Sequence, residues 1–277
     1  MASLQELRKR LRSIQSTGQL AGAMRTAATA KYARVSRVRE EFSPYADACR
    51  DMLRMLGSGG IARECGAPSD RACFVVFGGN RGLCGGFNAE LIRFLDAALE
   101  NCAETPLLLV CGKKAAAHLR ERGVPFEEYS VSDVPSYDEI KPVAARLRSA
   151  YVTGEAGRVT VLYQSFKNML TQLPAAERLL PGEEAEGAEE APLLLFLPDR
   201  ETIGGQLAVS CLDARLFGLA LENASGAQAA TIMAMRSACD NAAESAANLE
   251  ITINRRRQAE VTSSVIETAS GSLQQGD

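Results

Sequence analysis

The 277-residue chain has no tryptophan, a single histidine and no two cysteines in a CxxC spacing. A zinc site needs several His or Cys ligands, so His118 alone gives it little to build on. Aromatic residues make up 5% of the chain, which is few for a surface that stacks nucleic-acid bases. The sequence therefore predicts no metal site.

Long hydrophobic runs are also missing. No apolar run approaches the ~18 residues of a membrane span, and the start, MASLQELRKR, lacks the apolar core of a signal peptide. The net charge of −3 gives no overall electrostatic case for nucleic acid. Several of the eight cysteines lie in apolar, strand-like segments, which suits reduced thiols. We expect a soluble protein on the cytoplasmic side.

Proline is absent from residues 206–270. A single helix of that length would measure roughly 100 Å, whereas a compact globule of 277 residues would be only ~50 Å across. The C-terminal segment, residues 206–272, is therefore predicted to project and to need a companion helix. Small and apolar residues recur there in steps of three and four, at Ile232, Met235, Cys239, Ala242, Ala246, Leu249 and Ile253.

The N-terminal segment, residues 1–60, is predicted to be that companion. Ser3 and Glu6 form a capping-box pattern at its start. Gly18 and Gly22 each cost about 1 kcal/mol relative to Ala in a helix, which indicates a close backbone approach or a bend near them. The apolar rhythm begins at Leu4, Leu7, Leu11 and Ile14.

Basic residues dominate this segment. Up to Arg39, nine Lys and Arg residues stand against Glu6 alone, a net charge of +8. The pattern fits a solvated helix face, and it also fits docking onto an acidic partner. A nucleic-acid scaffold is a further interpretation, which lacks interleaved aromatic residues.

The middle of the chain, residues 70–200, alternates short apolar runs with helix-like spacers. This alternation predicts an α/β layer with a largely parallel sheet, inserted between two antiparallel terminal helices. A Gly-rich linker should precede it, from residue 57 to 69, and an acidic linker should occupy residues 181–192. The expected strands are 72–77, 107–111, 159–163 and 193–197, and the expected helices are 88–102, 113–122 and 137–152.

A glycine-rich loop, residues 77–88, follows the first expected strand. It resembles a phosphate cradle in outline, but neither GxGxxG nor a P-loop motif is present. A tight strand-to-helix turn is the alternative. Cys84 with His118 lacks a third positioned group, and the neighbours Glu127 and Glu128 would point to opposite faces of a strand. We predict no catalytic residue and no cofactor.

Together, these residues resemble the gamma subunit of rotary F-type ATP synthases, over essentially the whole chain and in order. The loop NRGLCGGFN at residues 80–88 and the MAMR, DN and RQA groups of the tail carry most of the likeness. The remaining groups are residues 14–17, 23–24, 43–46, 222–223 and 228–230, with Asn254 and Thr262.

The resemblance implies a non-catalytic central shaft: an antiparallel coiled coil with a Rossmann-like domain at its foot. It implies three alpha and three beta subunits, an epsilon subunit and a membrane c-ring as partners, at the cytoplasmic face of the cell membrane and driven by H⁺ or Na⁺. By the same resemblance, Arg257, Gln258 and Thr262 would meet catch loops of beta, and Met24 would face acidic beta loops. The chain departs from the usual family residues at Gln19, Gly22, Ala227 and Thr231.

Two other functions stay open on the sequence. The glycine-rich loop would fit a nucleotide-binding or hydrolytic enzyme with a coiled-coil appendage. The basic N-terminal segment would fit a nucleic-acid scaffold.

Overall fold

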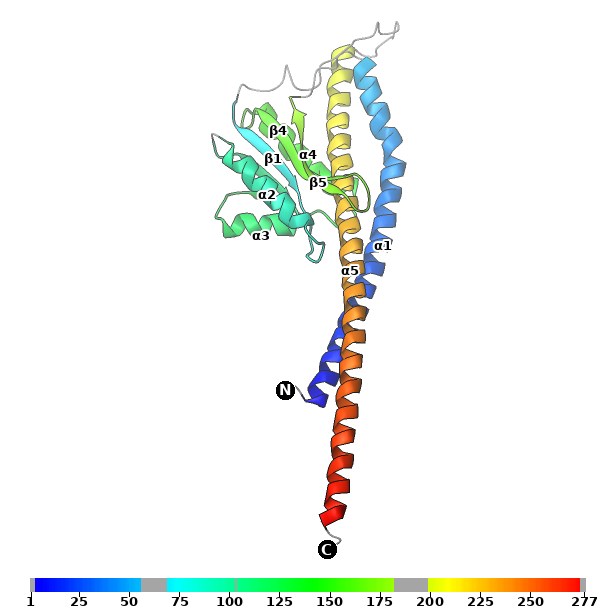
Figure 1. Cartoon of the computed structure of the whole chain (residues 1–277). Coiled ribbons are helices and arrows are strands. Elements are labelled where there is room, and N and C mark those ends of the chain that lie inside the picture. The colour runs from blue at the N-terminus through cyan, green and yellow to red at the C-terminus, as the bar shows by residue number, and fades with distance from the viewer. Residues whose placement is uncertain (1–2, 56–68, 103, 182–198, 275–277) are drawn as a thin grey trace. The chain divides into compact units, whose positions relative to one another are not determined.

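The computed structural model describes residues 3–55, 69–102, 104–181 and 199–274 (Figure 1). The predicted fold class, an α/β domain between two long terminal helices, is confirmed. The chain divides into two compact units, Met1–Ala27 with Ala234–Asp277, and Ala28–Met233. The elements are α1 (Leu4–Met55), β1 (Ala72–Phe77), α2 (Phe87–Glu100), β2 (Leu107–Cys111), α3 (Lys113–Glu121), β3 (Glu127–Tyr129), α4 (Tyr137–Val152), β4 (Arg158–Phe166), β5 (Gln172–Leu180) and α5 (Arg200–Gln274).

The unit Ala28–Met233 contains a five-stranded sheet in the order β3-β2-β1-β4-β5. Strand β1 pairs in parallel with β2 and β4, β2 pairs in parallel with β3, and β5 runs antiparallel to β4. The expected strands 72–77 and 107–111 are confirmed, and 159–163 lies inside β4. The expected strand 193–197 lies outside the described residues. Strands β3 and β5 were not predicted, because neither contains a continuous apolar run.

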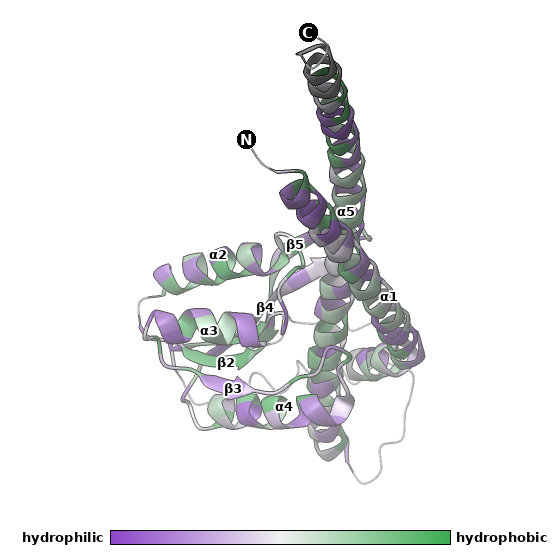
Figure 2. Ribbon diagram, turned by 90° about the horizontal axis from the view of Figure 1, so that it is seen from below, coloured by the Kyte–Doolittle hydropathy of each residue, from purple (hydrophilic) through white to green (hydrophobic). Residues whose placement is uncertain are grey.

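Both faces of the sheet are covered by helices (Figure 2). Successive residues of a strand point to opposite faces, and in β1 Val75 joins one core while Val76 joins the other. The core that contains Val76 includes side chains of α2 and α3, and the core that contains Val75 includes side chains of α4 and α5. Strand β2 is buried along its whole length for this reason.

In the unit Met1–Ala27 with Ala234–Asp277, the two terminal helices pair in antiparallel fashion. Gln15 contacts Glu250, and Gly18 lies beside Ala242, so the number of the partner falls as the number in α1 rises. A Cβ added at Gly18 would lie 3.2 Å from the Cβ of Ala242, so the predicted close approach is confirmed. The predicted capping box is confirmed too, with the Ser3 amide donating to Glu6 at 2.7 Å.

The predicted domain limits, 1–60, 70–200 and 206–272, stay predictions. Most of both expected linkers lies outside the described residues. Within the described ranges, no helix is long and apolar enough to cross a membrane.

Candidate functional site

The glycine-rich loop lies at the carboxyl edge of the parallel strands, where doubly wound sheets bind their ligands. Two of its backbone donors, however, are directed to the protein itself. The Gly78 amide donates to the Cys111 carbonyl at 2.7 Å, and the Gly79 amide donates to the Asn88 side chain at 3.1 Å. These two N–H groups are therefore not offered to a phosphate.

At the N-terminus of α2, the helix that follows the loop, the place where an anion would bind is taken by the Glu90 side chain. A Cβ added at Gly86, the N-cap, would lie 2.9 Å from a carboxylate oxygen of Glu90. Glu90 in the first turn already supplies the negative charge that a helix N-terminus attracts. The absent side chain at Gly79 likewise makes room for Asn88, whose Oδ1 would be 2.5 Å from an added Cβ. These contacts favour the tight-turn interpretation of the glycines.

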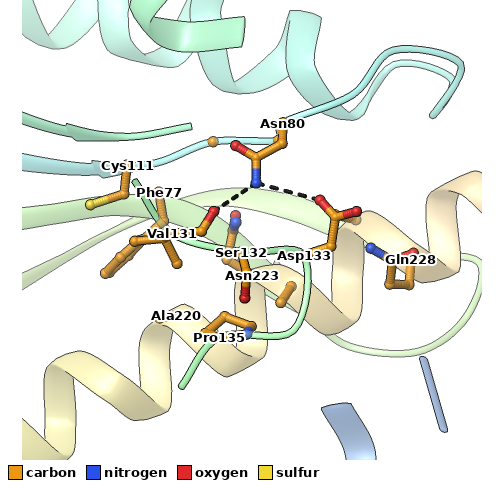
Figure 3. A pocket seen from close by; sticks show the side chains of 14 residues that line it. Phe77, Asn80, Cys111, Val131, Ser132, Asp133, Pro135, Ala220, Asn223 and Gln228 are labelled. Atoms are coloured by element: carbon orange, nitrogen blue, oxygen red, sulfur yellow. Dashed lines mark hydrogen bonds between the residues drawn. The ribbon is translucent and has the colours of Figure 1, made fainter. Parts of the chain in front are cut away.

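A cavity of about 30 Å³ lies beside the loop (Figure 3). Small-molecule sites enclose about 300–1,000 Å³, so this cavity admits water but not a nucleotide. Helix α5 supplies part of its wall through Ala220, Asn223, Ala224, Ala227 and Gln228. Helix α5 thus forms one wall of this cavity, and the space that is left is too small for a nucleotide.

Side chains of helix α5 form hydrogen bonds with β4 at the carboxyl edge of the parallel strands. Strand β4 continues past the end of β1, so donors of its last residues have no strand partner on that side. Asn223 accepts the Gln164 amide at 3.1 Å, and Glu222 accepts the Phe166 amide at 2.9 Å. The sequence marked residues 222–223 only as a family likeness, and the structure gives them this anchoring contact.

Asp133, in the segment between β3 and α4, contacts side chains of α1 and of the glycine-rich loop. Lys31 of α1 donates to its Oδ2 at 2.5 Å, and Arg81 of the glycine-rich loop lies 3.2 Å from the same oxygen. Asn80 donates to Oδ1 at 3.4 Å and to the Val131 carbonyl at 2.7 Å. No sequence pattern singled out Asp133, because its partners are far away along the chain.

The residues considered for catalysis are not brought together. Cys84 accepts a contact from the Asn88 amide at 3.0 Å, and burial raises the pKa of its thiol, which disfavours a nucleophilic thiolate. His118 lies 3.0 Å from Asp96 instead of near Cys84. Among the described residues, no group of three or more His, Cys, Asp or Glu side chains could hold a metal ion.

Glu127 and Glu128 do point apart, as expected for neighbours on a strand. Glu127 accepts from Arg146 at 2.8 Å, whereas Glu128 accepts from Arg120 at 3.0 Å. Arg146 also binds Glu155, and its hydrogen bond holds the pKa of Glu155 below the ordinary value. Glu127 and Glu155 therefore share Arg146, whereas Glu128 pairs with Arg120.

The residues predicted to contact beta all lie in the unit of the paired terminal helices. Met24 on α1 is half-buried, and Arg257, Gln258 and Thr262 on α5 are exposed. The Thr262 hydroxyl donates to the Gln258 carbonyl at 2.8 Å. The hydrogen-bond donor of this hydroxyl is thus satisfied by the backbone of α5. The Arg257 and Gln258 side chains are exposed and do not pack into the core.

Large apolar side chains are exposed on the same part of α5. Ile251 is 52% exposed and Val265 is 62% exposed, and each lies one heptad away from Gln258. Val261 and Ile266 are exposed as well. The sequence analysis did not single them out, because it assigned the apolar positions of the tail to the helix pair.

The fold defines a class: an α/β domain inserted between two long terminal helices that pair with each other. The family profile described as ATP synthase matches residues 3–273. The ATP synthase gamma chains of Desulforamulus reducens and Phenylobacterium zucineum are 30% and 33% identical to it, each over 98% of this chain and 98% and 99% of their own. A chain from the Euglena gracilis mitochondrial ATP synthase (OSCP/F1/c-ring) aligns with a TM-score of 0.71 at 19% identity, over 98% of this chain and 93% of its own. The chain belongs to the ATP synthase gamma chain family, and it is a non-catalytic subunit.

Proposed function

We propose that this chain is the central shaft of an F-type ATP synthase driven by protons or sodium ions. It couples rotation of the c-ring to conformational change at the catalytic beta subunits. The observation that carries this is the full-length similarity to proteins named ATP synthase gamma chain. A chain of the Euglena gracilis ATP synthase rotor also shares the fold, with a TM-score of 0.65. The partners are three alpha and three beta subunits, epsilon and the c-ring.

A shaft works by differential contact. Only a ligand that binds two conformations with different affinity can shift their balance, and the same holds for a rotating surface. A shaft whose sides differ would stabilise a different beta conformation at each rotational position. On α5, charged Arg257 and apolar Val265 are both exposed in the described structure, so the surface that α5 offers is not uniform.

A shaft that transmits the free energy of several ions must be stiff against bending and twisting. Each charge that crosses the membrane releases about 2.3 kcal/mol per 100 mV, so several ions contribute to one ATP. A pair of helices resists bending and twisting better than one helix. The tight Gly18–Ala242 contact and the Cys239 thiol, 3.6 Å from the Gly18 carbonyl, support a firmly closed pair.

The contacts with beta are proposed at Met24, Arg257, Gln258 and Thr262. Exposure of the three α5 residues supports this, because a side chain that meets a partner must be free of its own core. The exposed apolar residues one heptad to either side would give the same surface a hydrophobic part. Attachment to the cytoplasmic face of the cell membrane would come through the complex, as a peripheral protein.

The proposed function is tested by co-expressing alpha and beta with and without this chain. We expect a stable assembly that hydrolyses ATP, and rotation of a bead fixed to the chain while beta is fixed to a surface. A chain that never joins an ATP-hydrolysing assembly would remove the proposal.

The contact residues are tested against matched controls on the same helix. Arg257→Ala with Gln258→Ala should lower coupled turnover about tenfold, the effect of ~1.4 kcal/mol, whereas Arg255→Ala should change it little. Thr262→Ala is compared with Thr252→Ala, because both threonines are exposed and both donate to the carbonyl four residues earlier. Equal effects within each pair would show that the proposed residues have no special contact.

A further inference from the structure

Asp133 connects two segments that are distant in sequence. Its carboxylate binds Lys31 in the middle of α1 and Arg81 in the glycine-rich loop, and it meets Asn80 of the same loop. We call Lys31, Asn80, Arg81 and Asp133 the Asp133 clamp. All four lie in the unit Ala28–Met233, in which α1 and the α/β domain share one core.

The segment that carries Asp133 is itself held in place. The Ser132 hydroxyl lies 2.6 Å from the Val134 carbonyl and 3.0 Å from the Glu139 carboxylate, and its single hydrogen is donated to one or the other. Glu139 also accepts the Ser136 amide at 2.9 Å, in the capping box that starts α4. The backbone that carries Asp133 is therefore held by hydrogen bonds on its C-terminal side, as a residue that positions another element requires.

The clamp differs from an ordinary surface ion pair. The side chain of Asp133 is only 18% exposed and binds two cations at once. Burial alone would raise the pKa of Asp133, but Lys31, Asn80 and Arg81 together hold it below its ordinary value. The carboxylate is thus charged at neutral pH, and without it Lys31 and Arg81 would face each other as like charges.

The other contacts of α1 in this unit include an edge-on ring contact between Phe42 and Phe217, with centroids 4.7 Å apart, and a hydrogen bond from the Cys211 thiol to the Cys49 carbonyl at 3.0 Å. Val35 is fully buried in the core, and Val38 and Phe42 pack against it. Apolar burial itself is non-directional, and all of these α1 residues lie C-terminal to Lys31. Charge-assisted hydrogen bonds depend on angle as well as distance, and Lys31 provides one from the side of the helix.

We propose that Asp133 is a positioning residue that fixes the rotational setting of α1 against the α/β domain, so that both shaft helices carry torque. This inference rests on the proposed function, since torque exists only in a rotating shaft. Asp133 sets the angle, Lys31 transmits it to α1, and Arg81 with Asn80 ties the glycine-rich loop to the same point.

The test variant is Asp133→Asn, which keeps the shape and removes the charge. The matched control is Asp138→Asn, because Asp138 binds Lys141 at 2.7 Å within α4 and joins no separate segments. A charge swap, Lys31→Asp and Arg81→Glu with Asp133→Lys, restores an opposite pair at both contacts of the clamp. Each variant is made in the full chain and studied alone and in the complete complex.

The first readout is hydrogen exchange of the isolated full chain, which needs no partner. Asp133→Asn should speed exchange around Lys31 and in the loop that contains Arg81, while Asp138→Asn should not. Exchange identical to the wild-type chain at both places would overturn the clamp. If the wild-type chain never joins an ATP-hydrolysing complex, the proposed function fails, and the torque role fails with it.

The second readout is ion pumping per ATP hydrolysed by the complete complex in membrane vesicles. Asp133→Asn should lower this ratio by about two- to fivefold, the range for losing a partly buried ion-pair network, and the charge swap should recover much of it. Thermal unfolding of the complex is measured in parallel, because a purely structural role would lower stability without a change in the ratio. An unchanged ratio, or a ratio that the swap does not recover, would overturn the positioning role.

Discussion

The two halves of α5 are one continuous helix in two different environments. Between Leu212 and Ala230 only Arg215 is exposed, and Leu216, Leu219 and Leu221 are fully buried. Between Arg236 and Ile266 only Ile253 is buried, and Ile251, Val261 and Val265 are exposed. The first half is held within its own unit, and the second half leaves apolar surface uncovered.

This difference teaches where stability and coupling reside. Burial of apolar side chains stabilises the folded chain, so substitutions in the first half should act mainly on folding. Exposed apolar side chains contribute little until a partner covers them. Substitutions in the second half should therefore act mainly on the assembled enzyme.

The largest contrast is expected between Leu219→Ala and Ile251→Ala. Loss of the Leu219 side chain leaves a cavity in the core and should lower the free energy of unfolding by about 3 kcal/mol. Ile251→Ala should change it by less than about 0.5 kcal/mol. Denaturant unfolding of the isolated chain, followed by circular dichroism, measures both, and similar losses would abolish the distinction between the two halves.

The next contrast uses asparagines. Asn223→Ala leaves the Gln164 amide buried without its acceptor, which should lower the free energy of unfolding by about 2 kcal/mol. Asn248→Ala, on the exposed half, should change it by less than about 0.5 kcal/mol. The same denaturation experiment checks this pair, and a harmless Asn223→Ala would show that Asn223 does not anchor α5 to β4.

In a third contrast, substitutions in the exposed half of α5 should affect the assembled complex and not the stability of the isolated chain. Val261→Ser with Val265→Ser should leave the isolated chain as stable as before, because both side chains are exposed. In the complex, each should weaken the fit by about 1 kcal/mol and so lower coupled ATP hydrolysis. The control is Val152→Ser, an exposed valine of α4. Unchanged hydrolysis with both α5 substitutions would mean that no partner covers these valines.

The sequence predicted those parts of the fold that local patterns encode. The helix rhythm from Ile232 to Ile253 and the apolar run of β2 each depend on neighbours a few residues apart. Strand β3 escaped prediction because Glu127 and Glu128 carry no apolar signal, and it forms only through pairing with β2.

The polar contacts of the candidate site were beyond such patterns. Lys31 and Asp133 are 102 residues apart in the chain, and Gln164 and Asn223 are 59 apart. Each residue taken alone is an ordinary surface or helix residue. Only the fold reveals that Lys31 binds Asp133, whereas the sequence analysis counted Lys31 as one residue of a basic helix face.

The smallest expected contrast lies within the helix pair, between Gly22→Ala and Gly18→Ala. Both glycines are inside α1, so alanine should favour the helix by about 1 kcal/mol at either position. At Gly22 the added methyl would lie 4.0 Å from the Cys239 sulfur, an ordinary contact, and the gain should appear as higher stability. At Gly18 it would lie 3.2 Å from the Ala242 Cβ, so the helices must shift and stretch the Cys239 contact to the Gly18 carbonyl. Thermal unfolding followed at 222 nm should show a gain for Gly22→Ala alone, and equal gains would mean that the pair is looser at Gly18 than its geometry indicates.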